Sequence, residues 1–498
     1  MKRLHPISAR ALLGRASLLA VACSAVHTGC NWTEFDDYAH KAPIRVSSVP
    51  GDFRGTGYGN VVTTFRTGDN DAQSVVVASA GRETSVTFER MWTGHKIGDA
   101  TFTRCKRKED CEDSTGIGGA LIPFGRWARE TVQEETGCVL APAQPKAYVF
   151  CDSDVTANQS FQLDVGSIHG GNLQANFSGA GLPDGHPLGV VVLGAWSVST
   201  RSGEVSQGRV FVQPDFQPEG EPSDEDEVPL LEELPLTDPT DGELFADAND
   251  GDAGDLGAAI GVHPLGGDDL LIAVAQPSEG RVIVARYDAS AKQLVTHACI
   301  DSPDGSVRGF GKHLVVGDIN ADDEPEIIVG TDSVDSAERV WLYRGVGLPN
   351  APTAGDACPA WDNSPIEVSC SEGLHGVRCA DSAFGASIAL GDVDGDGFND
   401  LLVGAPDARV GSANQSGAVW LFPGGEDGSR DGGLDLEGAT NVVAHAKANA
   451  RVGMAVAALH TKERDEPVAG APGEQRVYTF MCSDLEADVA KQTLCLPK

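Results

Sequence analysis

Residues 382–425 read SAFGASIALGDVDGDGFNDLLVGAPDARVGSANQSGAVWLFPGG, and this stretch decides the fold. It opens with Phe384-Gly385, passes through two short apolar runs separated by an acidic turn, and reaches Gly404-Ala405-Pro406. A loop then leads to a third apolar run, Ala418 to Phe422. Short apolar runs bounded by Gly, Asp and Asn clusters predict β-strands joined by tight turns.

The same pattern recurs along the chain, so internal repetition is the main signal. Each copy supplies about four short strands, which form one twisted sheet that cannot bury both of its faces alone. Radial stacking of the sheets buries those faces, so we predict an all-β, seven-bladed β-propeller. The other copies begin at or near Tyr58-Gly59, Phe124-Gly125, Leu188, Leu256-Gly257, Phe310-Gly311 and Val452-Gly453. The positions that correspond to Gly404 are residues 78, 140, 194, 275, 330 and 470.

The Phe-Gly start, the acidic turn and the Gly-Ala-Pro end resemble the FG-GAP repeats that form the propeller of integrin α subunits. The resemblance covers residues 54–482; it is strong in three blades and degenerate in four, and the third blade lacks the Phe-Gly start. It implies seven blades and structural calcium ions that grip the hairpin between a blade's first two strands. Integrin function is not carried over with the fold, because the chain contains no Arg-Gly-Asp.

The acidic turn of the clearest copy has the spacing of a calcium loop. Asp392, Asp394, Asp396 and Asp400 occupy positions 1, 3, 5 and 9, and Phe398 at position 7 would offer its backbone carbonyl. Calcium takes six to eight oxygen ligands, and alternate positions of a tight loop can turn their carboxylates inward. A solvated acidic turn is the alternative reading. A second predicted calcium loop offers Asp318, Asn320, Asp322, Glu324 and Glu326. The turns at 266–269 and 460–462 do not fit, because the first is too short and the second carries a basic side chain.

The first thirty residues predict a signal peptide of the lipoprotein type, in which basic residues precede the apolar stretch Ala16 to Val26. Either Cys23 or Cys30 could carry the lipid. We favour Cys30, because its use leaves an even ten of the twelve cysteines for disulfides. We therefore expect an exported protein anchored in the cell envelope. The expected segments are the signal peptide 1–30, an N-terminal segment 31–53 with a ring-closing strand at 44–47, the propeller 54–484 with a solvated acidic linker at 217–253, and a C-terminal tail 485–498.

The pair Cys138 and Cys151 is the most specific disulfide prediction. These residues flank the hairpin 139–150 and fall directly opposite each other, where facing side chains can be cross-linked. Sequence alone leaves the remaining connectivity open. The other plausible pairs are Cys105–Cys111, Cys370–Cys379, Cys482–Cys495 and Cys299–Cys358.

The net charge of −36 disfavours nucleic acid as a partner, because the field of the protein repels a polyanion. The sequence contains no nucleophile elbow, zinc-protease helix or phosphate-binding loop. We therefore expect a non-enzymatic protein of adhesion, or one that binds a protein or glycan through its loops. The insertion 345–383 is the best candidate binding loop. A hydrolase or lyase with catalytic groups on several blades, or a structural envelope component, are the alternatives.

Overall fold

The computed structural model describes residues 255–480 with short gaps. Before residue 255 it describes the strands between residues 44 and 213 and the single residues 57, 121, 208 and 236. The gaps are 304–308, 332–338, 346, 354–355, 362–363, 371–376, 427–432, 438, 443–446 and 461–463. All described residues belong to one compact unit, Pro43–Lys498. In this part of the chain no helix has the length and apolar character needed to cross a membrane.

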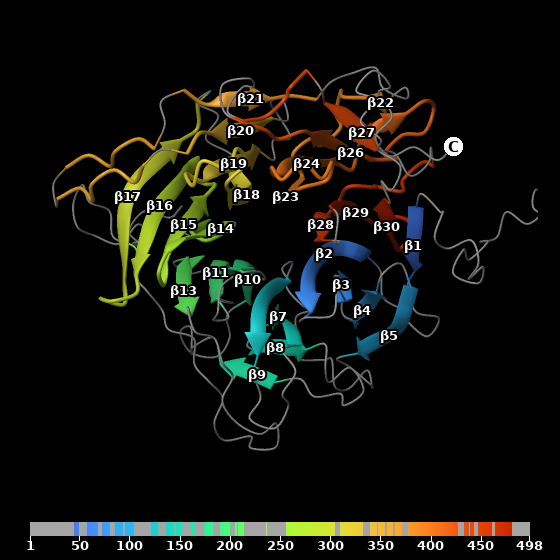
Figure 1. Ribbon diagram of the computed structural model, residues 1–498, viewed down its shortest axis with the longest axis horizontal. Helices are drawn as coiled ribbons and strands as arrows, with labels where there is room; N and C mark the ends of the chain where they lie inside the picture. Colours follow the sequence, from blue (N-terminus) through green and yellow to red (C-terminus); the bar gives the residue numbers. More distant parts are fainter. Residues whose placement is uncertain are drawn as a thin grey trace, which may run out of the picture. The chain divides into compact units, whose positions relative to one another are not determined.

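The described strands form seven four-stranded antiparallel sheets (Figure 1). Blades 1 to 3 contain β2 (Tyr58–Thr67), β3 (Ala72–Ser79), β4 (Ser85–Trp92) and β5 (His95–Thr103); β6 (Ile122–Trp127), β7 (Thr136–Ala143), β8 (Lys146–Cys151) and β9 (Phe161–Asp164); and β10 (Gln174–Leu182), β11 (Val190–Ser199), β12 (Val205–Ser206) and β13 (Arg209–Gln213). Blades 4 and 5 contain β14 (Ile260–Gly266), β15 (Asp269–Gln276), β16 (Arg281–Asp288) and β17 (Gln293–Asp301); and β18 (Phe310–Gly317), β19 (Glu326–Thr331), β20 (Val340–Tyr343) and β21 (Ile366–Val368). Blade 6 contains β23 (Ser387–Gly391), β24 (Asp400–Ala405), β26 (Ala418–Phe422) and β27 (Thr440–Val442), and blade 7 contains β28 (Val456–His460), β29 (Asp465–Ala471), β30 (Arg476–Phe480) and β1 (Ile44–Ser48).

The glycine of each Gly-Ala-Pro segment packs against the next blade. A Cβ atom on Gly404 would lie 2.1 Å from the carbonyl oxygen of Gly453, the glycine that opens blade 7. A Cβ on Gly470 would lie 1.9 Å from the carbonyl oxygen of Gly59, which opens blade 1. The opening glycines also have positive φ, +87° at Gly453 and +90° at Gly59, a conformation that favours glycine. The two halves of the repeat therefore meet between blades, and the contact between Gly470 and Gly59 joins the last blade to the first.

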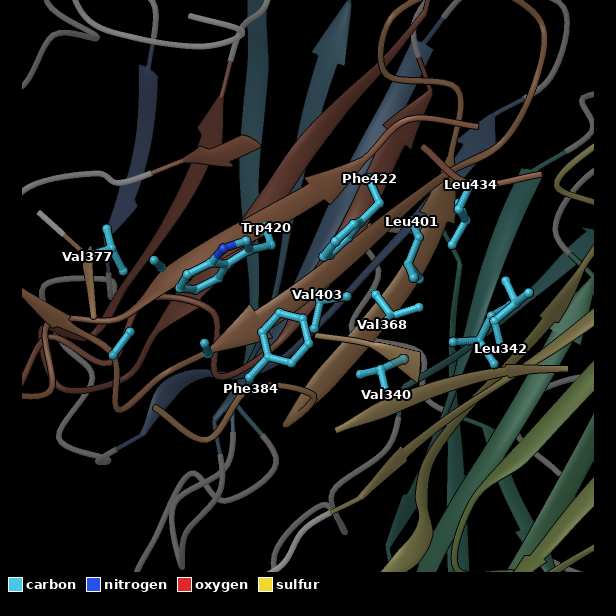
Figure 2. Packing of buried hydrophobic residues seen from close by; sticks show 14 of the residues in the cluster. Val340, Leu342, Val368, Val377, Phe384, Leu401, Val403, Trp420, Phe422 and Leu434 are labelled. Carbon is cyan, nitrogen blue, oxygen red and sulfur yellow. The ribbon is translucent and has the colours of Figure 1, made fainter. Parts of the chain in front are cut away.

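Apolar clusters fill the spaces between neighbouring blades. Between blades 5 and 6, Phe384 makes edge-to-face contacts with Trp420 and Phe422, at ring-centroid distances of 5.6 and 6.2 Å (Figure 2). Similar clusters join blades 3 and 4, 4 and 5, 6 and 7, and 7 and 1. Strand β6 contacts β2 of blade 1 and β10 of blade 3, which completes the series of neighbours. The arrangement confirms the predicted seven-bladed β-propeller. All seven positions of the Gly404 type lie in second strands, namely β3, β7, β11, β15, β19, β24 and β29.

Strand β1 completes blade 7 from the other end of the chain. It pairs antiparallel with β30, in a register that places Ile44 opposite Phe480 and Ser48 opposite Arg476 (Figure 1). The last blade thus combines an N-terminal strand with three C-terminal strands. This is the strand expected at residues 44–47.

The insertion that follows β20 returns to the blades on either side. Its first half is bonded to blade 4 through the disulfide Cys299–Cys358, and the Cys299 N–H donates to the Pro359 carbonyl at 2.7 Å. Cys299 also forms a parallel β-bridge with Ala360, so the insertion extends the outer edge of blade 4. Its second half contains the disulfide Cys370–Cys379 and strand β22 (Val377–Arg378), which pairs with β25 (Arg409–Val410) of the loop in blade 6. The insertion therefore connects blades 4, 5 and 6.

Leu236 changes the expectation for the acidic linker 217–253. Its side chain is 3% exposed and packs in the apolar cluster between blades 3 and 4, so this residue is not part of a solvated insertion. The reason is local: the segment VPLLEELPL at residues 228–236 carries apolar side chains between its acids. The rest of the linker, the signal peptide with Cys23 and Cys30, and the cysteines at 105, 111, 482 and 495 lie outside the described residues.

Candidate metal centre

The acidic turn of blade 6 joins β23 to β24 and brings three carboxylates together. Oxygen atoms of Asp392, Asp394 and Asp400 all lie within 4.8 Å of one another. Three aspartates shape the turn by accepting backbone hydrogen bonds, and Asp394 accepts from the N–H of Asp396 at 3.2 Å. Asp392 accepts from the N–H groups of Gly395 (2.8 Å) and Gly397 (3.0 Å), and Asp396 accepts from that of Phe398 (3.0 Å). The sequence therefore closes this loop around its own carboxylates.

Asp400 is fully buried at the base of the loop, at 0% exposure. Its Oδ2 accepts from the N–H groups of Val393 (2.7 Å) and Asp394 (3.2 Å), and its Oδ1 accepts from that of Gly424 (2.7 Å). Burial and the charge of Asp394 nevertheless raise the pKa of Asp400 to about 7. Burial and the charge of Asp396 raise the pKa of Asp394 to about 6. Burial and the neighbouring carboxylates both disfavour the charged forms of these groups, and a bound cation would favour the charged forms.

The loop of blade 5 repeats this framework with a constant offset of 74 residues. Glu326 takes the place of Asp400, accepting from the N–H groups of Ile319 (2.9 Å) and Gly345 (3.2 Å). Burial raises the pKa of Glu326 to about 7. Asp322 accepts from the N–H of Glu324 at 2.8 Å, just as Asp396 accepts from that of Phe398. Asp318 likewise accepts from Asp322 and Asp323, so the two loops share one hydrogen-bonded plan.

The blade 5 loop differs in two respects that bear on cation binding. Ala321 (φ +57°) and Asp323 (φ +66°) hold left-handed positions where blade 6 has Gly395 and Gly397, a conformation that costs a non-glycine residue roughly 1–2 kcal/mol. The amide nitrogen of Asn320 donates to Asp322 at 2.9 Å, so a neutral amide stands where blade 6 has the carboxylate of Asp394. Both differences predict weaker cation binding in blade 5 than in blade 6.

An acidic residue begins the second strand in each of the last four blades, and sequence reasoning missed this feature. It faces the last residue of the first strand, which is Gly266, Gly317, Gly391 or His460. The four acids are Asp269, Glu326, Asp400 and Asp465.

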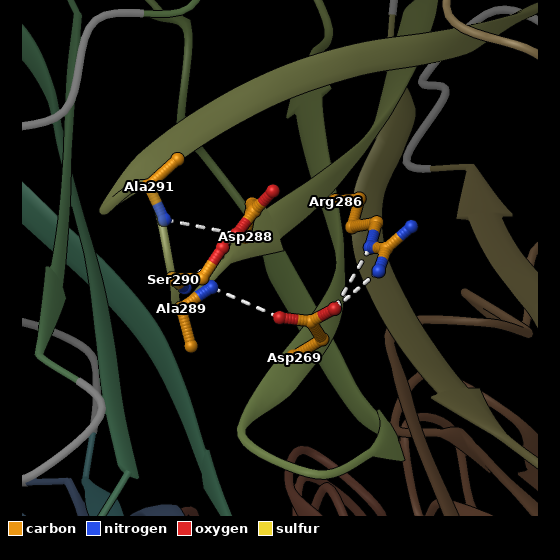
Figure 3. Close-up of polar contacts among 6 residues, drawn as sticks. All are labelled: Asp269, Arg286, Asp288, Ala289, Ser290 and Ala291. Atoms are coloured by element: carbon orange, nitrogen blue, oxygen red, sulfur yellow. Dashed lines mark hydrogen bonds and ion pairs between the residues drawn. The ribbon is translucent and has the colours of Figure 1, made fainter.

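Two of these four acids have a basic partner. In blade 4, Arg286 bonds Asp269, whose other oxygen accepts the Ala289 N–H at 2.9 Å (Figure 3). In blade 7, His460 Nδ1 lies 2.5 Å from Asp465 Oδ1. Among the described contacts of Glu326 and Asp400, the partners are backbone N–H groups and the Asn320 amide. Of these last four blades, 5 and 6 are therefore the two in which a metal ion would supply the missing positive charge.

Asp465 also supports the blade 6 loop from the neighbouring blade. Its Oδ2 accepts the N–H of Asp392 at 3.0 Å, and its own N–H donates to the Asp392 carbonyl at 2.5 Å. The second residue of each loop packs against the next blade. Ile319 lies in the apolar cluster of blades 5 and 6, and Val393 lies in that of blades 6 and 7. Each loop is therefore fixed to the blade that follows it.

The structure bears on three of the five proposed cysteine pairs. It contains the disulfides Cys299–Cys358 and Cys370–Cys379, with Cα–Cα distances of 5.7 and 5.8 Å. Cys138 lies directly opposite Cys151 in the register of β7 and β8. This register is the one predicted from the hairpin 139–150.

Comparisons with known proteins agree with the repeat analysis. A family model described as FG-GAP repeat matches residues 384–422, which include the blade 6 loop. Integrin alpha-7 of Homo sapiens is 35% identical over 136 residues, which cover 26% of this chain and 10% of that protein. Integrin alpha-4 of Xenopus laevis is 28% identical over 183 residues, which cover 35% of this chain and 15% of that protein. The matches thus span a small fraction of the integrin chains.

Solved structures include a similar chain in the crystal structure of BBS1N in complex with ARL6DN, soaked with mercury. It has a TM-score of 0.45 and 13% sequence identity, and the match covers 88% of this chain and 96% of that chain. The repeat model and the integrin relatives, together with the seven antiparallel sheets, show that this chain contains an FG-GAP, integrin α-like β-propeller domain.

Proposed function

We propose that this chain is an extracytoplasmic, calcium-binding β-propeller that binds a protein or glycan partner and is not an enzyme. The observation that carries the calcium assignment is the buried Asp400, held by backbone N–H groups beside Asp392 and Asp394. A buried carboxylate without a counter-charge is costly, and an oxygen-rich loop at this spacing suits a hard cation of calcium's size.

Each loop would hold one ion. In blade 6 the ligands would be the carboxylates of Asp392, Asp394, Asp396 and Asp400 with the carbonyl of Phe398. In blade 5 they would be Asp318, Asn320, Asp322 and Glu326 with the carbonyl of Glu324. A bound ion would bring positive charge between the first two strands of the blade. Because it binds the folded loop, it would stabilise the fold by mass action.

Thermal melting of the propeller in calcium and in EDTA tests this assignment. We expect calcium to raise Tm, and Asp394→Ala to remove most of that increase by deleting a central ligand. Asp268→Ala is the matched control, because Asp268 is an exposed aspartate in the short turn of blade 4. A Tm that is equal in calcium and EDTA would remove the basis for the proposed sites.

Two features support export and anchoring. Disulfides such as Cys299–Cys358 persist in oxidising compartments outside the cytosol. The N-terminal segment has the composition of a lipoprotein signal, with Cys30 as the preferred lipidated residue. Mass spectrometry of the mature N-terminal peptide tests this point: a lipid mass that disappears in Cys30→Ser but remains in Cys23→Ser supports the assignment, and the reverse result moves the anchor to Cys23.

The binding role is supported by the integrin relatives and by the insertion of blade 5. The insertion is fixed by two disulfides, so its exposed loops are presented on an ordered frame. Immobilised propeller can be tested against arrays of glycans and extracellular proteins in calcium and in EDTA. Selective retention that is lost in EDTA supports a calcium-dependent binding protein.

A further inference from the structure

The two candidate calcium loops lie in neighbouring blades and are directly bonded to each other. The side-chain amide of Asn399, in the blade 6 loop, donates to the backbone carbonyl of Asp318 at 2.7 Å. Asp318 is the first candidate ligand of the blade 5 loop, and Asn399 immediately precedes the buried ligand Asp400. A single side chain therefore connects the ligand-bearing backbones of both loops.

Gly424 reinforces this connection. A Cβ atom there would lie 2.2 Å from the carbonyl oxygen of Asn399 and 3.3 Å from that of Ile319, so the backbones of both loops approach this glycine closely. The N–H of Gly424 donates to Asp400 at 2.7 Å. Movement of Asp400 relative to Asp318 would disturb the hydrogen bond from Asn399 to Asp318 and the one from Gly424 to Asp400.

We propose that Asn399 couples the two sites, so that calcium bound in the blade 5 loop raises the affinity of the blade 6 loop for calcium. The proposal rests on the calcium sites proposed above. An ion on Asp318 fixes the carbonyl that Asn399 bonds, and Asn399 in turn holds the residue next to Asp400. The second ion then binds a loop that is already ordered, so its binding loses less conformational entropy. By linkage, calcium in blade 6 raises the affinity of blade 5 by the same factor.

Calcium titration calorimetry on six matched proteins tests this coupling. Asp322→Ala leaves the blade 6 loop as the functional site, and Asp396→Ala leaves the blade 5 loop. The coupling factor is the product of the two stepwise binding constants of the wild type, divided by the product of the two single-site constants. We expect a factor of about 5 or more in the wild type, the lower end of typical allosteric coupling. In an Asn399→Ala background, measured with the same two site knockouts, we expect a factor near 1.

Controls separate the coupling from folding and from the existence of the sites. Asn414→Ala, a change in an exposed turn of the same blade, must retain the wild-type factor. Each variant must keep a cooperative melt in EDTA, and Asn399→Ser replaces Asn399→Ala if the latter does not fold. If the wild type binds calcium at two sites with a coupling factor near 1, or if the factor is equal with and without Asn399, the proposed coupling is wrong. The proposed calcium sites are unaffected by either result. Absence of calcium binding in the wild type overturns the proposed function instead.

Discussion

At the residue scale, the close approach of neighbouring blades explains the glycine of the two Gly-Ala-Pro segments, Gly404 and Gly470. Each lies in a second strand, where any side chain would collide with a backbone carbonyl of the next blade. The colliding atom is rigid main chain, so the neighbour cannot move aside as the end of a flexible side chain would. The glycine therefore sets the distance between blades and not the conformation of its own strand.

Gly404→Ala should therefore lower stability by about 2–3 kcal/mol, at the upper end of the cost of overpacking a core. The new methyl would lie 2.1 Å from the Gly453 carbonyl oxygen, so blades 6 and 7 must move apart. Urea unfolding of the wild type and variant measures the loss. Gly347→Ala is the control, because a Cβ there meets its nearest neighbour, Glu324 Oε1, at an ordinary 3.7 Å. Equal losses in the two variants would argue against the close-packing explanation.

The hairpins of the last four blades show at the element scale which parts of the site the sequence could predict. The candidate metal ligands of the blade 6 loop are neighbours in the chain, so the spacing of Asp392, Asp394 and Asp396 is visible without a structure. The partners Arg286 of Asp269 and Asp318 of Asn399 come from other strands or other blades. No local pattern marks them, since only the register and the packing of the blades bring them together.

The same distinction applies to the fold. The number of blades follows from the count of repeats, because each repeat is one local hairpin unit. The return of the insertion to blades 4 and 6, and the burial of Leu236, depend on contacts between distant segments. The facing positions of Cys138 and Cys151 were predictable because the turn of a short hairpin fixes its register.

The hairpin of blade 4 predicts a dependence of stability on pH. The hydrogen bond from Arg286, followed by that from the Ala289 N–H, lowers the pKa of Asp269 below its ordinary value of 3.8 (Figure 3). A lowered folded-state pKa stabilises the fold above the unfolded pKa, and this contribution is lost as pH falls through the folded pKa. Because the pair is partly exposed, we expect no more than about 1 kcal/mol.

Asp269→Asn tests this expectation by removing the charge. At pH 7 the variant should be less stable than the wild type in urea unfolding, and the difference should shrink steadily below about pH 4. Asp268→Asn, at the neighbouring exposed position, should leave the curve unchanged. A difference that persists undiminished at pH 2 would mean that the carboxylate acts through packing and not through its charge.

The insertion of blade 5 makes a separate prediction about its two disulfides. The bond Cys299–Cys358 closes a segment with a sequence separation of 59, whereas Cys370–Cys379 closes one of 9. Chain-entropy arguments give about 4 kcal/mol for the longer loop and about 2.5 kcal/mol for the shorter. Denaturant unfolding of the two paired Cys→Ser variants should therefore show the larger loss for the pair 299 and 358. The opposite order would indicate that local packing, and not loop closure, governs their contribution.

The whole molecule depends on the junction between its first and last blades. Three kinds of contact meet there: the pairing of β1 with β30, the approach of Gly470 to Gly59, and an apolar cluster that includes Tyr58 and Val477. Radially stacked blades bury their faces only if every blade has two neighbours. Elsewhere each blade is followed along the chain by its neighbour in the ring. At the junction, the last and first blades are far apart in the sequence, so non-covalent contacts must hold them together.

Removal of β1 tests the junction. A chain that begins at residue 53 should remain folded, because the contacts of Gly59 and Tyr58 persist, but it loses five paired positions along β30. At about 0.5–1 kcal/mol for each backbone hydrogen bond, the loss should be roughly 3 kcal/mol and should lower Tm. The exposed edge of β30 should also promote self-association, since an unpaired strand edge can pair with a second chain. Melting and sedimentation velocity, with a chain that begins at residue 43 as the control, measure both effects. If the two chains melt together and both stay monomeric, the glycine contact and the apolar cluster hold the ring without β1.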